Sequence, residues 1–309
     1  MSKKKAPGLP SETERAERRE AERRLMADAV DRMRTSEGWR RWLTVRSHFH
    51  DYTLRNQILI AAQCPEATRV AGFKRWLGLG YAVRKGERSI RIWAPCPPSR
   101  KAIEKWRREG ADPDEKPRTY FRMVGVFDRS QVDPLPDFPG GVLDLDPPTR
   151  PIDGDELADL HDPLVALAEE IGVAVVLGGV PAGAGGVFRP DRLEIGLRPV
   201  SAEVSPNHQV KTLIHEVGHA LVRLEKEEED PALTYSEEEV VVECVAFTVC
   251  SAVGLDTSGF SVPYVASWSQ GEEIGRLAGL VDRLASRLED AVWAGRVEGD
   301  AEERTAAAG

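Results

Sequence analysis

The residues best suited to chemistry lie in one short stretch, His215-Glu216-Val217-Gly218-His219. Because an α-helix turns once in 3.6 residues, His215 and His219 stand one turn apart on the same face, where both can ligate one metal ion. Glu216 lies between them and is placed to take a proton from a water on that ion, as in zinc peptidases with this motif. The stretch predicts a zinc-dependent peptide hydrolase with Glu216 as its general base.

The alternative is an amphipathic helix with two histidines at its polar edge. The surrounding sequence argues against it, because Ser205-Pro206 supplies a helix cap followed by proline at the first helical position. Apolar residues also recur at helical spacing: Val210, Leu213, Ile214, Val217, Leu221 and Leu224. A largely buried helix with two histidines needs a partner for them, and a metal ion is the partner that the motif predicts.

A catalytic zinc takes three protein ligands and leaves one position open, so a third ligand is expected downstream. The acidic candidates are Glu225, Glu227, Glu228, Glu229, Asp230, Glu237, Glu238, Glu239 and Glu243. The run 225–230 is typical of a solvated turn. Ser236 and Glu239 fit a capping box, which gives Glu239 a structural role at the start of a second helix.

Glu243 is the favoured third ligand. It is a single carboxylate inside the apolar run 240–250, where an unpaired charge is costly and metal coordination removes that cost. The alternatives are a Glu243 that reaches solvent or pairs with an arginine, and Glu239 as the second choice of ligand.

Composition indicates one large or two ordinary domains in the 309 residues, without an apolar run long enough to span a membrane. The charged N-terminus is unlike a signal peptide, so we expect a cytoplasmic protein with no membrane partner and four reduced cysteines. Charge is uneven: residues 1–110 carry 26 Lys and Arg against 13 Asp and Glu, whereas the remainder carries 16 against 38. A basic half of this kind points to a polyanionic partner.

The coarse pattern predicts an α+β chain, in which a small basic nucleic-acid-binding domain is linked to a metallopeptidase domain. We expect a charged helical arm (1–35), the basic domain (36–130), a proline-rich linker (131–152) and the peptidase domain (153–309). Within these, helices are expected at 10–35, 52–64, 155–171 and 271–294 besides the two motif helices. Strands are expected at 89–94, 119–128, 173–177, 186–188 and 193–197. An edge strand beside the metal helix could receive an extended peptide.

Basic and aromatic residues are interleaved in the basic domain, as a groove for single-stranded nucleic acid requires. The candidate contacts are Tyr52, Arg55, Asn56, Arg69, Lys74, Arg75, Arg84, Lys85, Arg88 and Arg91. The alternative is a solvated basic surface over a small tryptophan core, and Trp76 and Trp93 fit that core role better. No helix-turn-helix or zinc-finger pattern is present, which disfavours sequence-specific reading of duplex DNA.

With these motifs in hand, the chain resembles the ArdC-type antirestriction proteins. In the N-terminal half the resemblance rests on 52–63, Ala71-Gly-Phe-Lys-Arg-Trp76, Val83-Arg-Lys-Gly-Glu87 and Ile92-Trp-Ala-Pro95. In the C-terminal half it rests on His215-Glu-x-x-His219, Glu239-Val-Val-Val-Glu243 and Tyr264-Val-Ala-Ser-Trp268. The charged insertion at 97–117 has no counterpart in that pattern.

The resemblance implies a single-stranded-DNA-binding domain followed by a zincin-like peptidase domain of the ImmA/IrrE kind, of gluzincin type. It implies Zn²⁺ held by His215, His219 and Glu243, with Glu216 as the general base. The function expected is therefore that of a DNA-binding, antirestriction-like zinc metalloendopeptidase. The alternatives are a non-catalytic DNA-protecting protein with a structural zinc, and a regulatory peptidase that cleaves a repressor or a phage protein.

Overall fold

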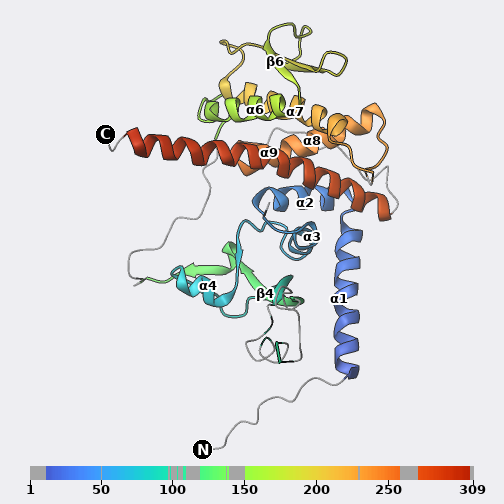
Figure 1. The fold of residues 1–309 in the computed structure, drawn as a ribbon. Helices are drawn as coiled ribbons and strands as arrows, with labels where there is room; N and C mark the ends of the chain where they lie inside the picture. Colours follow the sequence, from blue (N-terminus) through green and yellow to red (C-terminus); the bar gives the residue numbers. More distant parts are fainter. Residues whose placement is uncertain are drawn as a thin grey trace, which may run out of the picture.

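The structure is a computed structural model that describes residues 12–49, 51–96, 98, 103, 107–108, 119–136, 138, 150–228, 230–257 and 271–306. It has a mixed α+β architecture, as expected (Figure 1). None of the helices in these ranges combines the length and the apolar character needed to cross a membrane. The insertion at 97–117 lies almost wholly outside the described residues, as does the segment 264–268.

The N-terminal half contains helices α1 (Glu12–Arg32), α2 (Ser36–His48), α3 (Leu54–Gln63) and α4 (Phe73–Gly78). Its strands are β1 (Val70–Ala71), β2 (Tyr81–Val83), β3 (Ile90–Cys96), β4 (Tyr120–Asp128) and β5 (Val132–Pro134), with a 3-10 turn η1 (Arg129–Gln131) before β5. The strands form an antiparallel sheet in the order β1-β4-β3 and a separate β2-β5 pair. The predicted pairing of the strands at 89–94 and 119–128 is confirmed.

Two carboxamides of α3 close the free edge of β3. Asn56 donates to the carbonyl of Trp93 and accepts from its N–H, both at 2.8 Å. Gln63 makes the same pair of bonds with Arg91, at 3.0 and 2.9 Å. Since the two amides lie seven residues apart on one helix face, they meet alternate residues of the strand. The expectation that Asn56 contacts DNA is therefore corrected, because its buried side chain is committed to β3.

The C-terminal half contains η2 (Ala158–Leu160) and helices α6 (His161–Glu170), α7 (Pro206–Leu224), α8 (Tyr235–Ala252) and α9 (Gly271–Ala306). Its sheet has the order β6-β8-β7, built from β6 (Ala174–Leu177), β8 (Glu194–Leu197) and β7 (Gly186–Arg189). β6 runs parallel to β8, and β7 runs antiparallel to it. β7 is therefore an edge strand, and it packs on α7.

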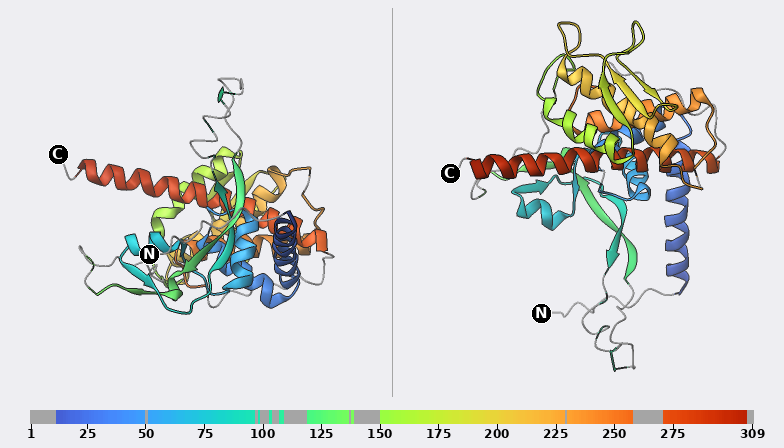
Figure 2. Two further views of the ribbon diagram at one scale, coloured as in Figure 1. Left: turned by 90° about the horizontal axis from the view of Figure 1, so that it is seen from below. Right: turned by 45° about the horizontal axis from the view of Figure 1, so that its top comes forward.

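The two halves share one core. α9 crosses the middle of the molecule, with α6, α7 and α8 on one side and α2 and α3 on the other (Figures 1 and 2). α2 also packs directly on α8, where the indole N–H of the buried Trp39 lies 3.3 Å from Cys244 Sγ. One contiguous hydrophobic cluster runs from Ala29 to Val292. The boundary visible in the sequence is thus not a boundary in the core.

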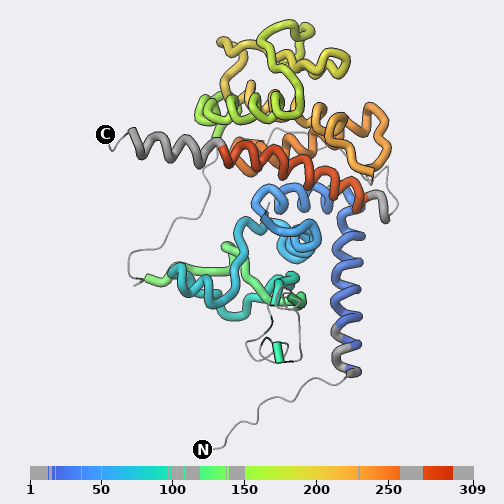
Figure 3. Tube along the Cα trace, viewed as in Figure 1, coloured from blue at the N-terminus to red at the C-terminus, as the bar shows by residue number. Residues whose placement is uncertain are grey.

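The expected linker is shorter than its composition suggests. Residues 131–134 belong to η1 and β5, and β5 pairs with β2 in register Val83↔Val132. Most of 137–149 lies outside the described residues (Figure 3).

The four cysteines are free thiols, and burial raises the pKa of Cys244 and of Cys250 to about 12. The expectation of reduced core thiols agrees with this arrangement.

A buried guanidinium joins the halves. Arg46 of α2 is fully buried and bonds to Asp282 at 2.9 Å, to Ser286 at 2.7 Å and to both carboxylate oxygens of the equally buried Glu289. Gln57 of α3 donates to the same Asp282 at 3.0 Å. Each charge is paired and hydrogen-bonded, which is the condition under which a buried ion pair is tolerated.

We expect Arg46→Ala to lower the free energy of unfolding by about 3–5 kcal/mol, because it leaves the Glu289 carboxylate buried without its cation. Arg41→Ala is the matched control, since Arg41 pairs with Glu37 on the exposed side of the same helix and should change stability by under about 1 kcal/mol. Urea unfolding of both variants measures the difference. Equal effects would contradict the role given to the buried pair.

Candidate metal centre

The two motif histidines lie where the sequence predicts. α7 begins with Pro206 at its first position, and the Ser205 hydroxyl accepts from the N–H of His208 as the helix cap. Val210, Leu213, Ile214 and Val217 are buried against the core, which fixes the helix and turns its histidines toward α8. The expected cap and helix are confirmed.

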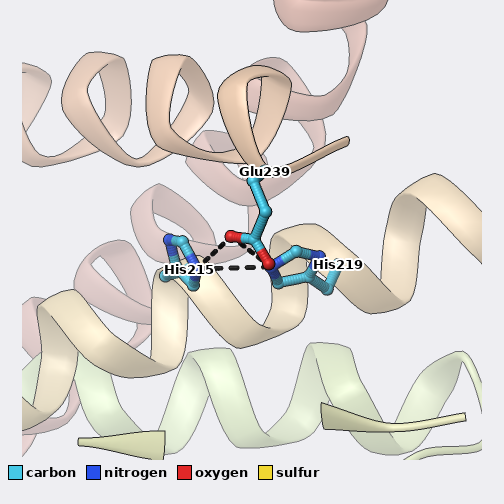
Figure 4. Close-up of side chains that lie close together, drawn as sticks. All are labelled: His215, His219 and Glu239. Atoms are coloured by element: carbon cyan, nitrogen blue, oxygen red, sulfur yellow. Dashed lines mark hydrogen bonds and ion pairs between the residues drawn. The ribbon is translucent and has the colours of Figure 1, made fainter. Parts of the chain in front are cut away.

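Three side chains converge between α7 and α8 (Figure 4). The Nε2 atoms of His215 and His219 are 3.2 Å apart, and Glu239 Oε2 lies 3.7 Å from the first and 3.4 Å from the second. Donors about 2.1 Å from a tetrahedral ion lie about 3.4 Å from one another. The three donors therefore have the chemistry and the spacing of a site that could hold a divalent metal.

The structure groups Glu239, not Glu243, with the histidines. Glu243 Oε1 is 3.6 Å from Nδ1 of His215, the ring nitrogen that faces away from His219. A carboxylate at that nitrogen can orient the ring, as the outer partners of metal-binding histidines do. Glu243, the third ligand expected from the sequence, thus lies outside the converging group, and its assignment as a ligand stays a prediction.

The position of Glu239 follows from the register of the helix cap. Thr234 and Glu237 form the capping box of α8, in place of the expected Ser236 and Glu239. The helix begins two residues earlier than expected, so Glu239 has no capping role and points from its second turn at α7. Partial burial of Glu243, whose side chain is 37% exposed, raises the pKa of its carboxyl.

Glu238 is a site residue that the sequence analysis named only among the acidic candidates. Its Oε1 lies 2.9 Å from Nδ1 of His219, and Arg223 holds the same carboxylate at 3.2 and 3.1 Å. The contact leaves Nε2 of His219 to face the convergence point. The available signal was the spacing of His219 and Arg223, one turn apart on α7, opposite an acidic helix start.

Glu216 is buried beside the histidines and bonded to the sheet. Its Oε2 accepts the N–H of Phe188 in β7 at 2.7 Å, and burial raises the pKa of its carboxyl. Burial likewise lowers the pKa of His215 to about 4, with the neighbouring His219 adding to the effect. Since a metal binds the neutral imidazole, His215 is in its ligating form at neutral pH.

Tyr235 is a second residue that the sequence analysis did not assign. It is 71% exposed at the start of α8, and a hydrogen bond to Glu239 raises the pKa of its hydroxyl. The phenol therefore stays protonated at neutral pH and can donate to the carboxylate of the candidate ligand.

The residues expected to contact DNA differ in their surroundings, and their role stays a prediction. Arg84 bonds to Glu87, to Asp133 and to the carbonyl of Ser130, whereas Tyr52 packs edge-to-face on Phe49. Exposed cations among the others are spread over α3, α4 and the turns: Arg55, Arg69, Lys74, Arg75, Lys85 and Arg88. Arg91 of β3 is half-buried.

Comparison with known proteins identifies one segment. Residues 20–127 match the family model of the N-terminal domain of anti-restriction factor ArdC, so this part of the chain is ArdC-like. The chain is also 25% identical over 300 residues to the uncharacterized protein pXO2-81/BXB0111/GBAA_pXO2_0111 of Bacillus anthracis, an alignment that covers 88% of this chain and 50% of that protein. This chain thus spans about half the length of that relative.

Two solved structures are similar to the chain. Both are of the antirestriction ArdC protein from the R388 plasmid, one Mn(II)-bound and one metal-free. Each is 20% identical to this chain and covers 78% of it and 85% of the solved chain, with TM-scores of 0.46 and 0.43.

β7 approaches α7 so closely that glycine is required at its start. A Cβ on Gly186 would lie 2.7 Å from Thr212 Cγ2 and 2.9 Å from Glu216 Cγ. We expect Gly186→Ala to displace Glu216 or the strand and to cost about 1–3 kcal/mol of stability. Gly275→Ala, at an exposed helical position with open space around it, should be neutral or stabilising. Thermal unfolding of the two variants tests this, and equal midpoints would contradict the close approach.

Metal content separates the roles of the two carboxylates on α8. We expect Glu239→Ala to lose the ion on gel filtration, because it removes one of three donors. Glu243→Ala should retain an ion with affinity lower by about 10–100-fold, because it removes only the partner of the His215 ring. Elemental analysis and competition with a chromophoric chelator give both values. The reverse order would return Glu243 to the position of third ligand.

Proposed function

We propose that the chain is a zinc-dependent peptide hydrolase joined to a unit that binds single-stranded DNA, acting in antirestriction. The observation that carries the hydrolase is the convergence of His215, His219 and Glu239 beside the buried Glu216. Two imidazoles, one carboxylate and an open fourth position are the donor set of a catalytic zinc. The ArdC-like segment at 20–127 supports the DNA-related half of the proposal.

His215, His219 and Glu239 would hold a divalent ion, which would supply Lewis acidity for a water and for the carbonyl of a scissile peptide. Glu216 takes a proton from the water and passes it to the leaving amine, a role favoured by its raised pKa. Glu238 contacts Nδ1 of His219 and Glu243 lies near Nδ1 of His215, so each carboxylate orients one histidine ring. The edge strand β7 offers an extended peptide a partner beside Glu216.

The second candidate is a DNA-protecting protein in which the metal is structural. Two observations favour it: the family match covers only the N-terminal part, and Glu216 already accepts the N–H of Phe188. A general base must release that N–H, or share its carboxylate with it, to reach a water. In the first candidate Glu216 is the general base, whereas in the second it serves only the bond to Phe188.

We expect Glu216→Ala to keep its metal and to cleave peptides at least about 100-fold more slowly than the wild type, because its general base is gone. Casein and a degenerate peptide library read by mass spectrometry are the substrates, and the metal content of each preparation is measured beside them. His208→Ala is the control, since His208 lies in the first turn of α7 and outside the group of converging side chains.

Cleavage that survives in Glu216→Ala would contradict the mechanism. Absence of cleavage by the metal-loaded wild type, with equal protection of single-stranded DNA from nuclease by the wild type and Glu216→Ala, would establish the second candidate instead.

A further inference from the structure

We infer that single-stranded nucleic acid binds in the groove lined by α1, by Arg55 of α3 and by Trp93 of β3, and continues along the neighbouring face of the β3–β4 hairpin, with Trp93 and Phe121 as the surfaces on which bases stack. The inference rests on the proposed DNA binding and names the place where it occurs. It also gives a role to α1, for which the sequence pattern predicts only a charged helical arm.

The groove is lined by α1 and the turn after it, from Arg19 to Arg34, by Arg55 of α3 and by Trp93 of β3. It has a volume of about 660 Å³, and its apolar floor is formed by Met26, Val30 and Trp93. Ala29 and Met33, buried at the C-terminal end of α1 or just beyond it, anchor that helix to the core. The wall is therefore a fixed part of the fold, and the volume is within the range of about 300–1,000 Å³ common for ligand sites.

Cations outnumber acids around this floor. The charged lining residues are Arg19, Arg23, Arg34 and Arg55, against Glu22 and Asp31. Arg34 pairs with Asp31 at 3.1 Å, whereas Arg19 and Arg55 have no ion-pair partner among the residues that the structure describes. Both are exposed, so they can reach a phosphate without breaking an existing pair.

The aromatic side chains lie on one face of the hairpin. In the register of β3 and β4, Trp93 is opposite Met123 and Pro95 is opposite Phe121. Because directly opposed residues share a face and side chains alternate along a strand, Phe121 lies on the face of Trp93, one pair further along. Phe121 is 63% exposed, and the backbone of Trp93 is fixed by Asn56.

This combination favours an unpaired strand over other occupants. Bases of a single strand can stack on aromatic faces while phosphates meet arginines, and bases within a duplex cannot. Arginine can contact both the phosphates and the bases, since its planar guanidinium binds phosphate and stacks on rings. A peptide helix in the groove would use the apolar floor but would leave the exposed Phe121 and the arginine rim without a matching partner.

The test is binding of a fluorescein-labelled oligo-dT to the full chain, followed by anisotropy over a range of salt concentrations. We expect Phe121→Ala to weaken binding by roughly five- to a hundred-fold, the effect of losing one stacked base. Tyr120→Ala is the matched control, because Tyr120 is 58% exposed on the opposite face of the same strand. Its affinity should stay within about two-fold of wild type.

The arginines are tested in the same assay. Arg19→Ala and Arg55→Ala should each reduce the slope of log affinity against log salt by about 0.7, because each removes one phosphate contact to a single strand. Arg24→Ala should leave the slope unchanged, since Arg24 is on α1 but outside the groove, with its side chain 75% exposed.

The outcomes are distinguishable. If the wild type binds oligo-dT but Phe121→Ala and Tyr120→Ala behave alike, the groove is wrong and the proposed DNA binding remains, at another surface. If a duplex competes as well as the single strand, the stacking surfaces are wrong. If the wild type does not bind oligo-dT at low salt, both the groove and the proposed DNA binding fail.

Discussion

The buried Arg46 joins the two halves of the molecule through its acidic partners on α9. A guanidinium without access to water must have its partners in place, so α2 and α3 are fixed to α9 through Asp282, Ser286 and Glu289. α8 packs on both α9 and α2, and α8 carries the carboxylates that face the histidines. The ArdC-like segment is therefore part of the frame that positions the candidate metal centre, and the fold joins the two proposed activities physically.

The acidic residues in the first turns of α8 make different contacts according to their position along the helix. Glu237 caps the helix, Glu238 holds His219, Glu239 faces the convergence point and Glu243 faces the outer nitrogen of His215. Residues one turn apart face the same neighbour, which explains how one short stretch can serve both histidines. On the other side of α7, glycine at the start of β7 lets the sheet approach Glu216 closely enough for a backbone hydrogen bond.

The amino-acid sequence predicts those parts of the molecule that local patterns determine. The His-Glu-x-x-His helix with its Ser205 cap, the helix at 54–63 and the β3–β4 pairing all follow from short-range spacing. Glu239 was only the second choice of ligand because Thr234 and Ser236 are both competent caps, and a shift of two residues moves Glu239 off the helix start. The shared core was missed because Arg46 and Glu289 are 243 residues apart, and no local pattern pairs them. Asn56 shows the same limit, since its partner is the backbone of a strand formed 37 residues later.

From their convergence we expect His215, His219 and Glu239 to hold one divalent ion through their inward-facing atoms. An anomalous-difference map from crystals of the zinc-loaded protein, measured at the zinc edge, tests it most directly. We expect one peak at about 2.0–2.2 Å from both histidine Nε2 atoms and from a Glu239 oxygen, with Glu243 at the outer nitrogen of the His215 ring. A peak coordinated by Glu243, or no peak between α7 and α8 in protein that carries zinc, would contradict it.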